Sequence, residues 1–169
     1  EIADVFKLIN KNNLSELRMI NLAFNNATKP FESSTIIPPK IKRIDISHVK
    51  FENNVMKNIL EVILTADYVD GLKFYCDKYH DEDQEIDDAM ANFQNISCEK
   101  LLEFSWRKNK IDTNLLNFLK RCPKLEKLIF EGNVYNSEEE SIVDKFAAIL
   151  PSLESLTSLY VCGYKKCVL

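Results

Sequence analysis

An internal repeat limits the folds open to this chain more than any other feature of its sequence. One template, apolar-x-x-apolar-x-apolar-x-x-(Asn or apolar)-x-apolar, fits six times, starting at residues 14, 41, 69, 101, 125 and 156. Apolar or aromatic residues fill 26 of the 30 template positions, whereas the overall hydrophobic content of 46% predicts roughly 14. The period of about 28 residues predicts a chain that stacks one short strand and one return segment per repeat.

Two stretches carry the pattern most clearly, LLEFSWRKNKI at 101–111 and LEKLIFEGNVY at 125–135, and Asn109 and Asn133 fill their polar slots. In these residues the chain resembles the leucine-rich repeat proteins, and its period is closest to the long-repeat subclass typified by ribonuclease inhibitor. The resemblance covers essentially the whole chain and implies an α/β fold. It implies a curved solenoid of about six repeats, with a parallel β-sheet on the concave face and helices or irregular segments on the convex face. Four copies depart from asparagine in the polar slot, at Leu22, Val49, Asp77 and Tyr164.

The segments between the predicted strands support this alternation. Apolar residues recur at helical spacing in three of them, over 54–65, 82–95 and 142–150. Asp112 can cap a short helix that stops before Pro123. Residues 25–40 contain three prolines and are expected to be irregular. Because strand and helix alternate, the sheet should be parallel.

We expect a single domain over residues 1–169 that is part of a longer solenoid. The first residues have a helical apolar face whose strand would precede residue 1, and the last predicted strand lacks a following helix to cover it. No apolar run approaches the 18 or so residues of a membrane span. The five cysteines are scattered and odd in number, which favours buried thiols in a reducing compartment, the cytoplasm or the nucleus.

Residues that could carry catalysis or hold a metal form no convincing motif, so we expect no enzyme activity and no cofactor. Cys76 and His80 are four residues apart, but no nucleophile motif surrounds them. The acidic stretch 81–88 lacks the glycine and glutamate that a calcium loop of the EF-hand type requires, and its carboxylates suit the first turn of a helix. The three glycines lie too far apart to form a phosphate-binding loop.

Side chains between the apolar slots of each strand should face outward on the concave side, because strand side chains alternate between the two faces. This face is therefore the predicted binding site for a protein partner, and tyrosine and arginine are the residue types enriched at the energetic centres of interfaces. The residues expected to carry binding are Tyr75, Arg107, Ile129, Glu131 and Tyr160, together with Lys73, Arg43 and Asp45.

The leading functional hypothesis is an intracellular scaffold, adaptor or inhibitor that binds a protein partner. One alternative is a Ran-type activator of small GTPases, which would need an asparagine or arginine on a loop near the bound nucleotide. Another is RNA or ribonucleoprotein binding through residues 100–127, where eight basic residues accompany three acidic ones. The net charge of −4 gives no general attraction to nucleic acid, and Trp106 is expected in the core. The oligomeric state is not predicted.

Overall fold

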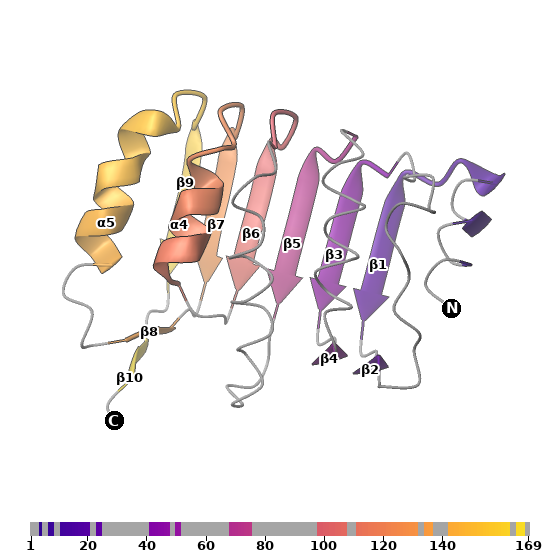
Figure 1. Ribbon diagram of the computed structural model, residues 1–169, viewed down its shortest axis with the longest axis horizontal. Coiled ribbons are helices and arrows are strands. Elements are labelled where there is room, and N and C mark those ends of the chain that lie inside the picture. Colours follow the sequence, from indigo (N-terminus) through magenta and orange to yellow (C-terminus); the bar gives the residue numbers. More distant parts are fainter. Residues whose placement is uncertain are drawn as a thin grey trace.

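In the computed structural model, the described part of the chain is built around a single parallel sheet of six strands (Figure 1). The structure describes residues 4, 7–8, 11–20, 23–24, 41–47, 50–51, 68–75, 98–107, 111–131, 134–136, 142–162 and 165–167. The strands follow one another in space in chain order, which is compatible with a solenoid. They are β1 (Glu16–Ile20), β3 (Arg43–Ser47), β5 (Gly71–Tyr75), β6 (Glu103–Arg107), β7 (Lys127–Glu131) and β9 (Ser158–Cys162).

The register of these strands confirms the alignment that the sequence template predicts. Every strand begins two residues after its template copy starts, and equivalent template positions stand directly beside one another. One row of paired residues lies on the face toward the core and comprises Leu17, Ile44, Leu72, Phe104, Leu128 and Leu159. The spacing of apolar residues thus specifies strand position and pairing together.

Short parallel pairs lie past the carboxyl ends of the main strands (Figure 1). At one side of the sheet, β2 (Ala23–Phe24) pairs with β4 (Lys50–Phe51). At the other side, β8 (Val134–Asn136) pairs with β10 (Lys165–Cys167). In each pair, both short strands directly follow main strands of the sheet. Backbone hydrogen bonds therefore also hold part of the turns that come after those main strands.

Two described helices cover one face of the sheet, α4 (Thr113–Leu119) and α5 (Ile142–Ile149), and a 3-10 turn, η4 (Leu150–Ser152), follows α5. The Asp112 carboxylate accepts a 2.8 Å hydrogen bond from the Leu115 amide, which confirms the predicted cap. The helix ends at Leu119, before Pro123, as expected. The helices expected at 54–65 and 82–95, and the irregular segment at 25–40, lie outside the described residues.

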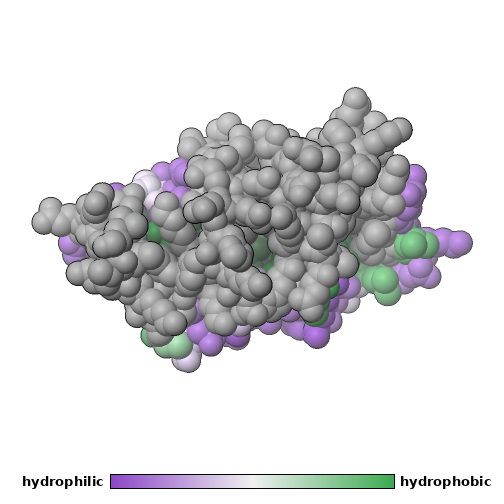
Figure 2. Space-filling model, turned by 90° about the horizontal axis from the view of Figure 1, so that it is seen from below, coloured by the Kyte–Doolittle hydropathy of each residue, from purple (hydrophilic) through white to green (hydrophobic). Residues whose placement is uncertain are grey.

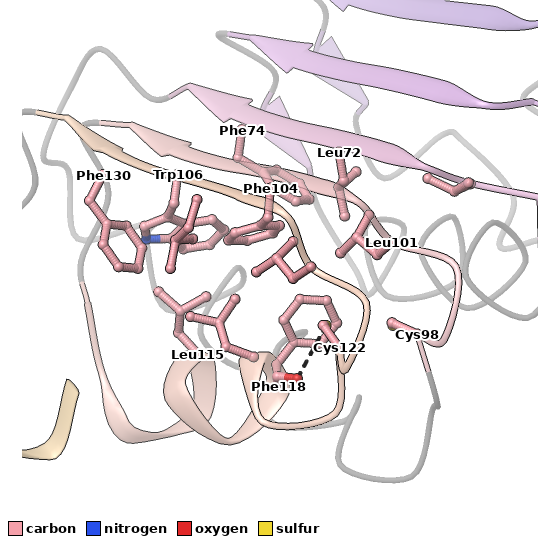
Figure 3. Packing of buried hydrophobic residues seen from close by; sticks show 14 of the residues in the cluster. Leu72, Phe74, Cys98, Leu101, Phe104, Trp106, Leu115, Phe118, Cys122 and Phe130 are labelled. Carbon is pink, nitrogen blue, oxygen red and sulfur yellow. Dashed lines mark hydrogen bonds between the residues drawn. The ribbon is translucent and has the colours of Figure 1, made fainter. Parts of the chain in front are cut away.

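The two faces of the sheet differ in polarity. Both helices lie on the same side of the strands in Figure 1, and Figure 3 shows apolar side chains of the strands on the side where α4 lies. The view in Figure 2 shows hydrophilic residues along the opposite margin of the molecule, with hydrophobic ones toward its two ends. We call the side facing away from α4 and α5 the outer face. No described helix is both long enough and apolar enough to span a membrane.

Aromatic rings fill the middle of the core, between the sheet and α4 (Figure 3). Trp106 is almost fully buried, as the sequence predicts, and its ring lies 5.2 Å from that of Phe74 and 5.9 Å from that of Phe104. Phe104 in turn contacts Phe118 of α4 at 5.5 Å between ring centroids. These contacts join two neighbouring strands and the helix into one packed unit.

The core thins at both ends of the sheet, and there the template overestimates burial. Leu14 fills the first slot of the first copy, yet 48% of its surface is exposed. Leu159 and Val161 of β9 point toward the helix side but are 45% and 41% exposed, whereas Leu128 and Phe130, beside them in β7, are fully buried. Burial at a template slot requires packed neighbours on both sides, and an end strand has described neighbours on only one.

Candidate functional site

The outer face of the sheet carries three columns of side chains, and each column takes one residue from every strand. Seven of the eight residues expected to bind a partner lie in the second and third columns, and the eighth, Arg43, lies in the first. The first column is Glu16, Arg43, Gly71, Glu103, Lys127 and Ser158; the second is Arg18, Asp45, Lys73, Ser105, Ile129 and Tyr160; the third is Ile20, Ser47, Tyr75, Arg107, Glu131 and Cys162.

Charges of opposite sign stand opposite one another wherever two charged residues pair across this face. The register pairs are Glu16 with Arg43, Arg18 with Asp45, Asp45 with Lys73, Glu103 with Lys127, and Arg107 with Glu131. Opposite charges directly across two strands stabilise a sheet, and like charges destabilise it. The columns therefore form a nearly neutral surface of alternating charge.

Glu103 lies between two lysines on the outer face, although the sequence analysis did not single it out. Its Oε1 atom is 3.1 Å from Nζ of Lys127 and 3.8 Å from Nζ of Lys73. The two lysines come from the strands on either side, so one carboxylate links three neighbouring strands. The parallel register is the signal that could have identified it, because residues 73, 103 and 127 occupy neighbouring positions once the copies are aligned.

Arg107 is held in place from two directions. Its Nε atom donates to the Ser105 hydroxyl at 3.1 Å, and its NH1 atom lies 3.2 Å from Oε2 of Glu131. Ser105 is fully buried even though it belongs to an outer column. A guanidinium fixed by two partners loses less side-chain entropy on binding than a free one, so Arg107 is preorganised for contact.

Tyr160 is the most exposed aromatic side chain of the described outer face, with 52% of its surface accessible. A hydrogen bond to the Cys162 side chain is the main cause that raises the pKa of Tyr160 above its ordinary value, and Glu131 adds to the effect. The phenol is neutral at physiological pH, as an unperturbed tyrosine is, and it retains its hydroxyl hydrogen. It offers both an apolar ring and a hydrogen-bonding group.

Ile129 lies in the second column as expected, but only 8% of its surface is accessible. A side chain this buried offers little area to a partner. Tyr75, Asp45 and Glu131 are half-buried, and Lys73 and Arg43 are exposed. The structure thus places all eight predicted residues on one face, and their part in binding stays a prediction.

The described basic residues of 100–127 are divided between the outer face of the sheet and the turns. Arg107 and Lys127 lie on the outer face beside carboxylates, whereas Lys100, Lys120 and Lys124 are exposed on turns. Arg121 is half-buried, and its Nε atom donates to the Asn117 carbonyl at 3.3 Å. Lys108 and Lys110 lie outside the described residues. Neighbouring carboxylates neutralise Arg107 and Lys127, so the outer face attracts a polyanion less strongly.

No cluster of three or more potential metal ligands occurs among the described residues. The Cys76–His80 pair and the acidic stretch 81–88 lie outside them. Protein-family models give no match to this chain, and a search of curated proteins gives none either. The geometry of the outer face is therefore the basis for a functional conclusion.

Of the free cysteines in the described part of the chain, two lie in the core and one lies at the surface. Cys98 and Cys122 are buried together beside α4, and the Cys122 thiol donates to the Phe118 carbonyl at 3.5 Å (Figure 3). A hydrogen bond with Cys98, together with burial, raises the pKa of Cys122. Cys162 is half-buried at the outer face.

We expect Ellman's reagent to modify Cys162 in the folded protein and to reach Cys98 and Cys122 only after local opening. A chain with Cys76→Ser and Cys167→Ser isolates these three thiols. The two buried thiols should react roughly a thousandfold more slowly than Cys162, because burial restricts access to both, and the raised pKa of Cys122 also limits formation of its thiolate. In denaturant all three should react at similar rates, and equal rates in the folded protein would contradict the burial.

Proposed function

We propose that this protein is a leucine-rich-repeat solenoid that binds another protein on its outer face, the concave side in that architecture. The repeat period of about 28 residues, with one strand for each copy and consecutive strands in parallel register, supports the architecture. Such a protein would act as a scaffold, adaptor or inhibitor in the cytoplasm or nucleus. The reduced cysteines of the described core are in keeping with that location.

The observation that carries this proposal is the composition of the outer face at β6, β7 and β9. There the exposed ring of Tyr160 lies near an ion pair between Arg107 and Glu131, whose atoms are already positioned. Aromatic and arginine side chains of this kind supply most of the binding energy in protein interfaces. Six strands spaced by about 4.8 Å span roughly 24 Å, which suits an interface of about 800 Å² per partner.

Charge distribution favours a protein over a nucleic acid as the partner. Each outer-face lysine or arginine that pairs with a charged residue across strands pairs with an acidic one. A polyanion would have to displace these carboxylates or bind beside them, whereas a protein can match both signs. No observation on the described residues specifically favours the GTPase-activator alternative.

The test compares a double substitution on the outer face with the substitution of a similarly exposed tyrosine outside it. A partner is captured from the native source, identified, purified and titrated calorimetrically against each variant. Arg107→Ala with Tyr160→Ala should weaken binding by roughly 30-fold or more, which corresponds to the 2 kcal/mol or more of an interface hot spot. Tyr68→Ala is the matched control, because Tyr68 is 46% exposed but precedes β5 and lies outside the three columns.

Equal affinity of the double variant and the control would contradict the proposed site. The dependence of affinity on salt then separates the classes of partner. An interface centred on Tyr160 and an internally paired arginine should lose little affinity between low and moderate salt, whereas nucleic-acid binding should weaken steeply. A steep loss, with RNA as the captured component, would replace this proposal with the RNA-binding alternative.

A further inference from the structure

Cys98 and Cys122 occupy the same position in neighbouring repeats, three residues before the first apolar slot of each copy. Each cysteine carbonyl accepts a hydrogen bond from the amide at that slot, at 3.2 Å from Leu101 and at 3.1 Å from Leu125. Leu153 forms the same backbone turn in the next copy. The two cysteines therefore belong to one column that runs along the repeats, at the turns that lead into β6 and β7.

The spacing of the repeats brings these two cysteines within reach of each other. Neighbouring strands of a sheet are about 4.8 Å apart, and disulfides join residues whose Cα atoms are about 4.4–6.8 Å apart. The Cys98 amide donates to the Arg121 carbonyl at 3.3 Å, so a backbone hydrogen bond joins Cys98 to the residue directly before Cys122. The separation of the two turns is therefore compatible with a disulfide between them.

The side chains of this pair also meet. Both thiols are free, lie in the core beside Phe118 and hydrogen-bond to each other (Figure 3). Cys122 is fully buried, whereas 5% of the surface of Cys98 is accessible. A reagent as small as water or peroxide can approach such a position far more easily than a bulky aromatic disulfide can. Of the two sulfur atoms, that of Cys98 is the one such a reagent reaches first.

Cys98 is also the better nucleophile of the pair. A hydrogen bond from the Cys122 thiol is the main cause that lowers the pKa of Cys98; burial opposes this effect, and the positive charge of Arg121 adds to it. The same hydrogen bond, together with burial, raises the pKa of Cys122. Because the thiolate is the reactive form of cysteine, Cys98 is suited to attack an oxidant and Cys122 is suited to react second.

We propose that Cys98 and Cys122 form a reversible disulfide when the chain meets hydrogen peroxide. The Cys98 thiolate attacks one peroxide oxygen and the O–O bond breaks, which gives a Cys98 sulfenic acid and a hydroxide that takes up a proton to become water. The Cys122 sulfur then bonds to the Cys98 sulfur, and the sulfenic hydroxyl leaves with the Cys122 proton as a second water. The two thiols together lose two electrons and the peroxide gains two. A small dithiol restores both thiols by exchange.

This disulfide would clamp one whole repeat in the middle of the sheet. The chain between the two cysteines contains β6 and α4, so the bond closes the loop that this strand and its helix form. Closing a loop removes conformational freedom from the unfolded chain, and side chains that are already in contact need little movement to be joined. In compartments that keep thiols reduced, such bonds are transient and sense oxidants. The clamp would therefore stabilise this repeat only while an oxidant is present.

The first experiment treats the unmodified chain with hydrogen peroxide, blocks the remaining thiols with N-ethylmaleimide in denaturant and maps the peptides by mass spectrometry. A pair of peptides joined through Cys98 and Cys122 should appear, and dithiothreitol should return both thiols. Cys162, at the surface, measures general oxidation in the same sample. If Cys98 and Cys122 were still free after Cys162 had been fully oxidised, the proposal would be overturned. A predominant bond from either of them to another cysteine would overturn it too.

Two serine variants test the order of the two steps. In Cys122→Ser the serine hydroxyl can replace the thiol as a hydrogen-bond donor to Cys98, so the reaction should stop at the sulfenic acid, which dimedone traps. In Cys98→Ser, dimedone should label Cys122 at least roughly tenfold more slowly, because Cys122 is more deeply buried and its pKa is raised. Faster labelling of Cys122 would contradict the proposed order. The unmodified chain decides whether the bond forms even if neither variant folds.

Thermal unfolding followed by circular dichroism tests the clamp itself. Oxidation should raise the Tm of the unmodified chain by roughly 5 °C or more, and Cys98→Ser treated in the same way should show no rise. A lower Tm after oxidation would mean that the bond distorts the fold, and it would overturn the proposed geometry. Neither cysteine belongs to the three outer columns, so the chain with Arg107→Ala and Tyr160→Ala should still form the disulfide. The outcome is therefore independent of whether the outer face binds a partner.

Discussion

Replacing Trp106 by alanine should lower the free energy of unfolding by about 3–5 kcal/mol, the range found for large aromatic side chains removed from packed cores. The ring is almost fully buried in the core between the sheet and α4, in contact with Phe74 of β5 and Phe104 of β6. The cavity would lie at the middle of the sheet, where neighbours on both sides restrict collapse. For a domain of this size such a loss is a large fraction of the total stability.

Urea denaturation followed by far-ultraviolet circular dichroism measures this loss without relying on tryptophan fluorescence. Phe146→Ala is the comparison from the end of the sheet. Phe146 contacts Phe130 at 5.3 Å between ring centroids but is only partly buried, so its removal should cost clearly less. If the Phe146 variant were the less stable of the two, the central packing would not be the main source of stability.

Removal of the Phe118 ring should separate α4 from the sheet at a similar cost, about 3–5 kcal/mol. Phe118 is the fully buried aromatic of α4, its ring lies 5.5 Å from that of Phe104, and its carbonyl accepts the hydrogen bond from Cys122. Phe118→Ala retains the carbonyl and deletes the ring, so the measured loss reports on side-chain packing alone.

Phe118→Leu keeps most of the apolar volume and should cost less than about 1.5 kcal/mol, as conservative apolar exchanges do. The same variants provide a local readout, because Cys98 and Cys122 lie beside this ring in Figure 3. In Phe118→Ala the two thiols should become reactive at lower denaturant concentrations than in the leucine variant. Unchanged thiol protection together with lost stability would show that α4 remains docked and that unfolding begins elsewhere.

The sequence predicts the pairing of the main strands because the apolar template does two things at once. Alternation within a copy decides which side chains face the helices, and recurrence of the copy decides which residues stand side by side. Trp106, Phe104 and Leu128 therefore occupy the core as expected, and the outer columns have the expected members. The helix cap at Asp112 is equally local, since one side chain and the amide three residues later define it.

Other features depend on information that a template does not contain. The burial of Ile129 and Ser105 in the outer columns reflects the length of neighbouring side chains and the path of Arg107 over Ser105. The link from Glu103 to two lysines needs the separation of side-chain tips across three strands. Exposure of Leu159 and Val161 depends on what packs beyond the last strand, which no property of the residues themselves decides.

The alternation of charge on the outer face has a consequence for how quickly a protein could associate with it. Positive and negative groups a few ångströms apart cancel at a distance, so the electrostatic potential of this surface decays well within one Debye length, about 8 Å in physiological salt. Long-range attraction would then contribute little, and association should proceed at the rate of an orientation-limited encounter, about 10⁵–10⁷ M⁻¹s⁻¹. Discrimination between proteins that collide with this surface would rest on how long each complex survives.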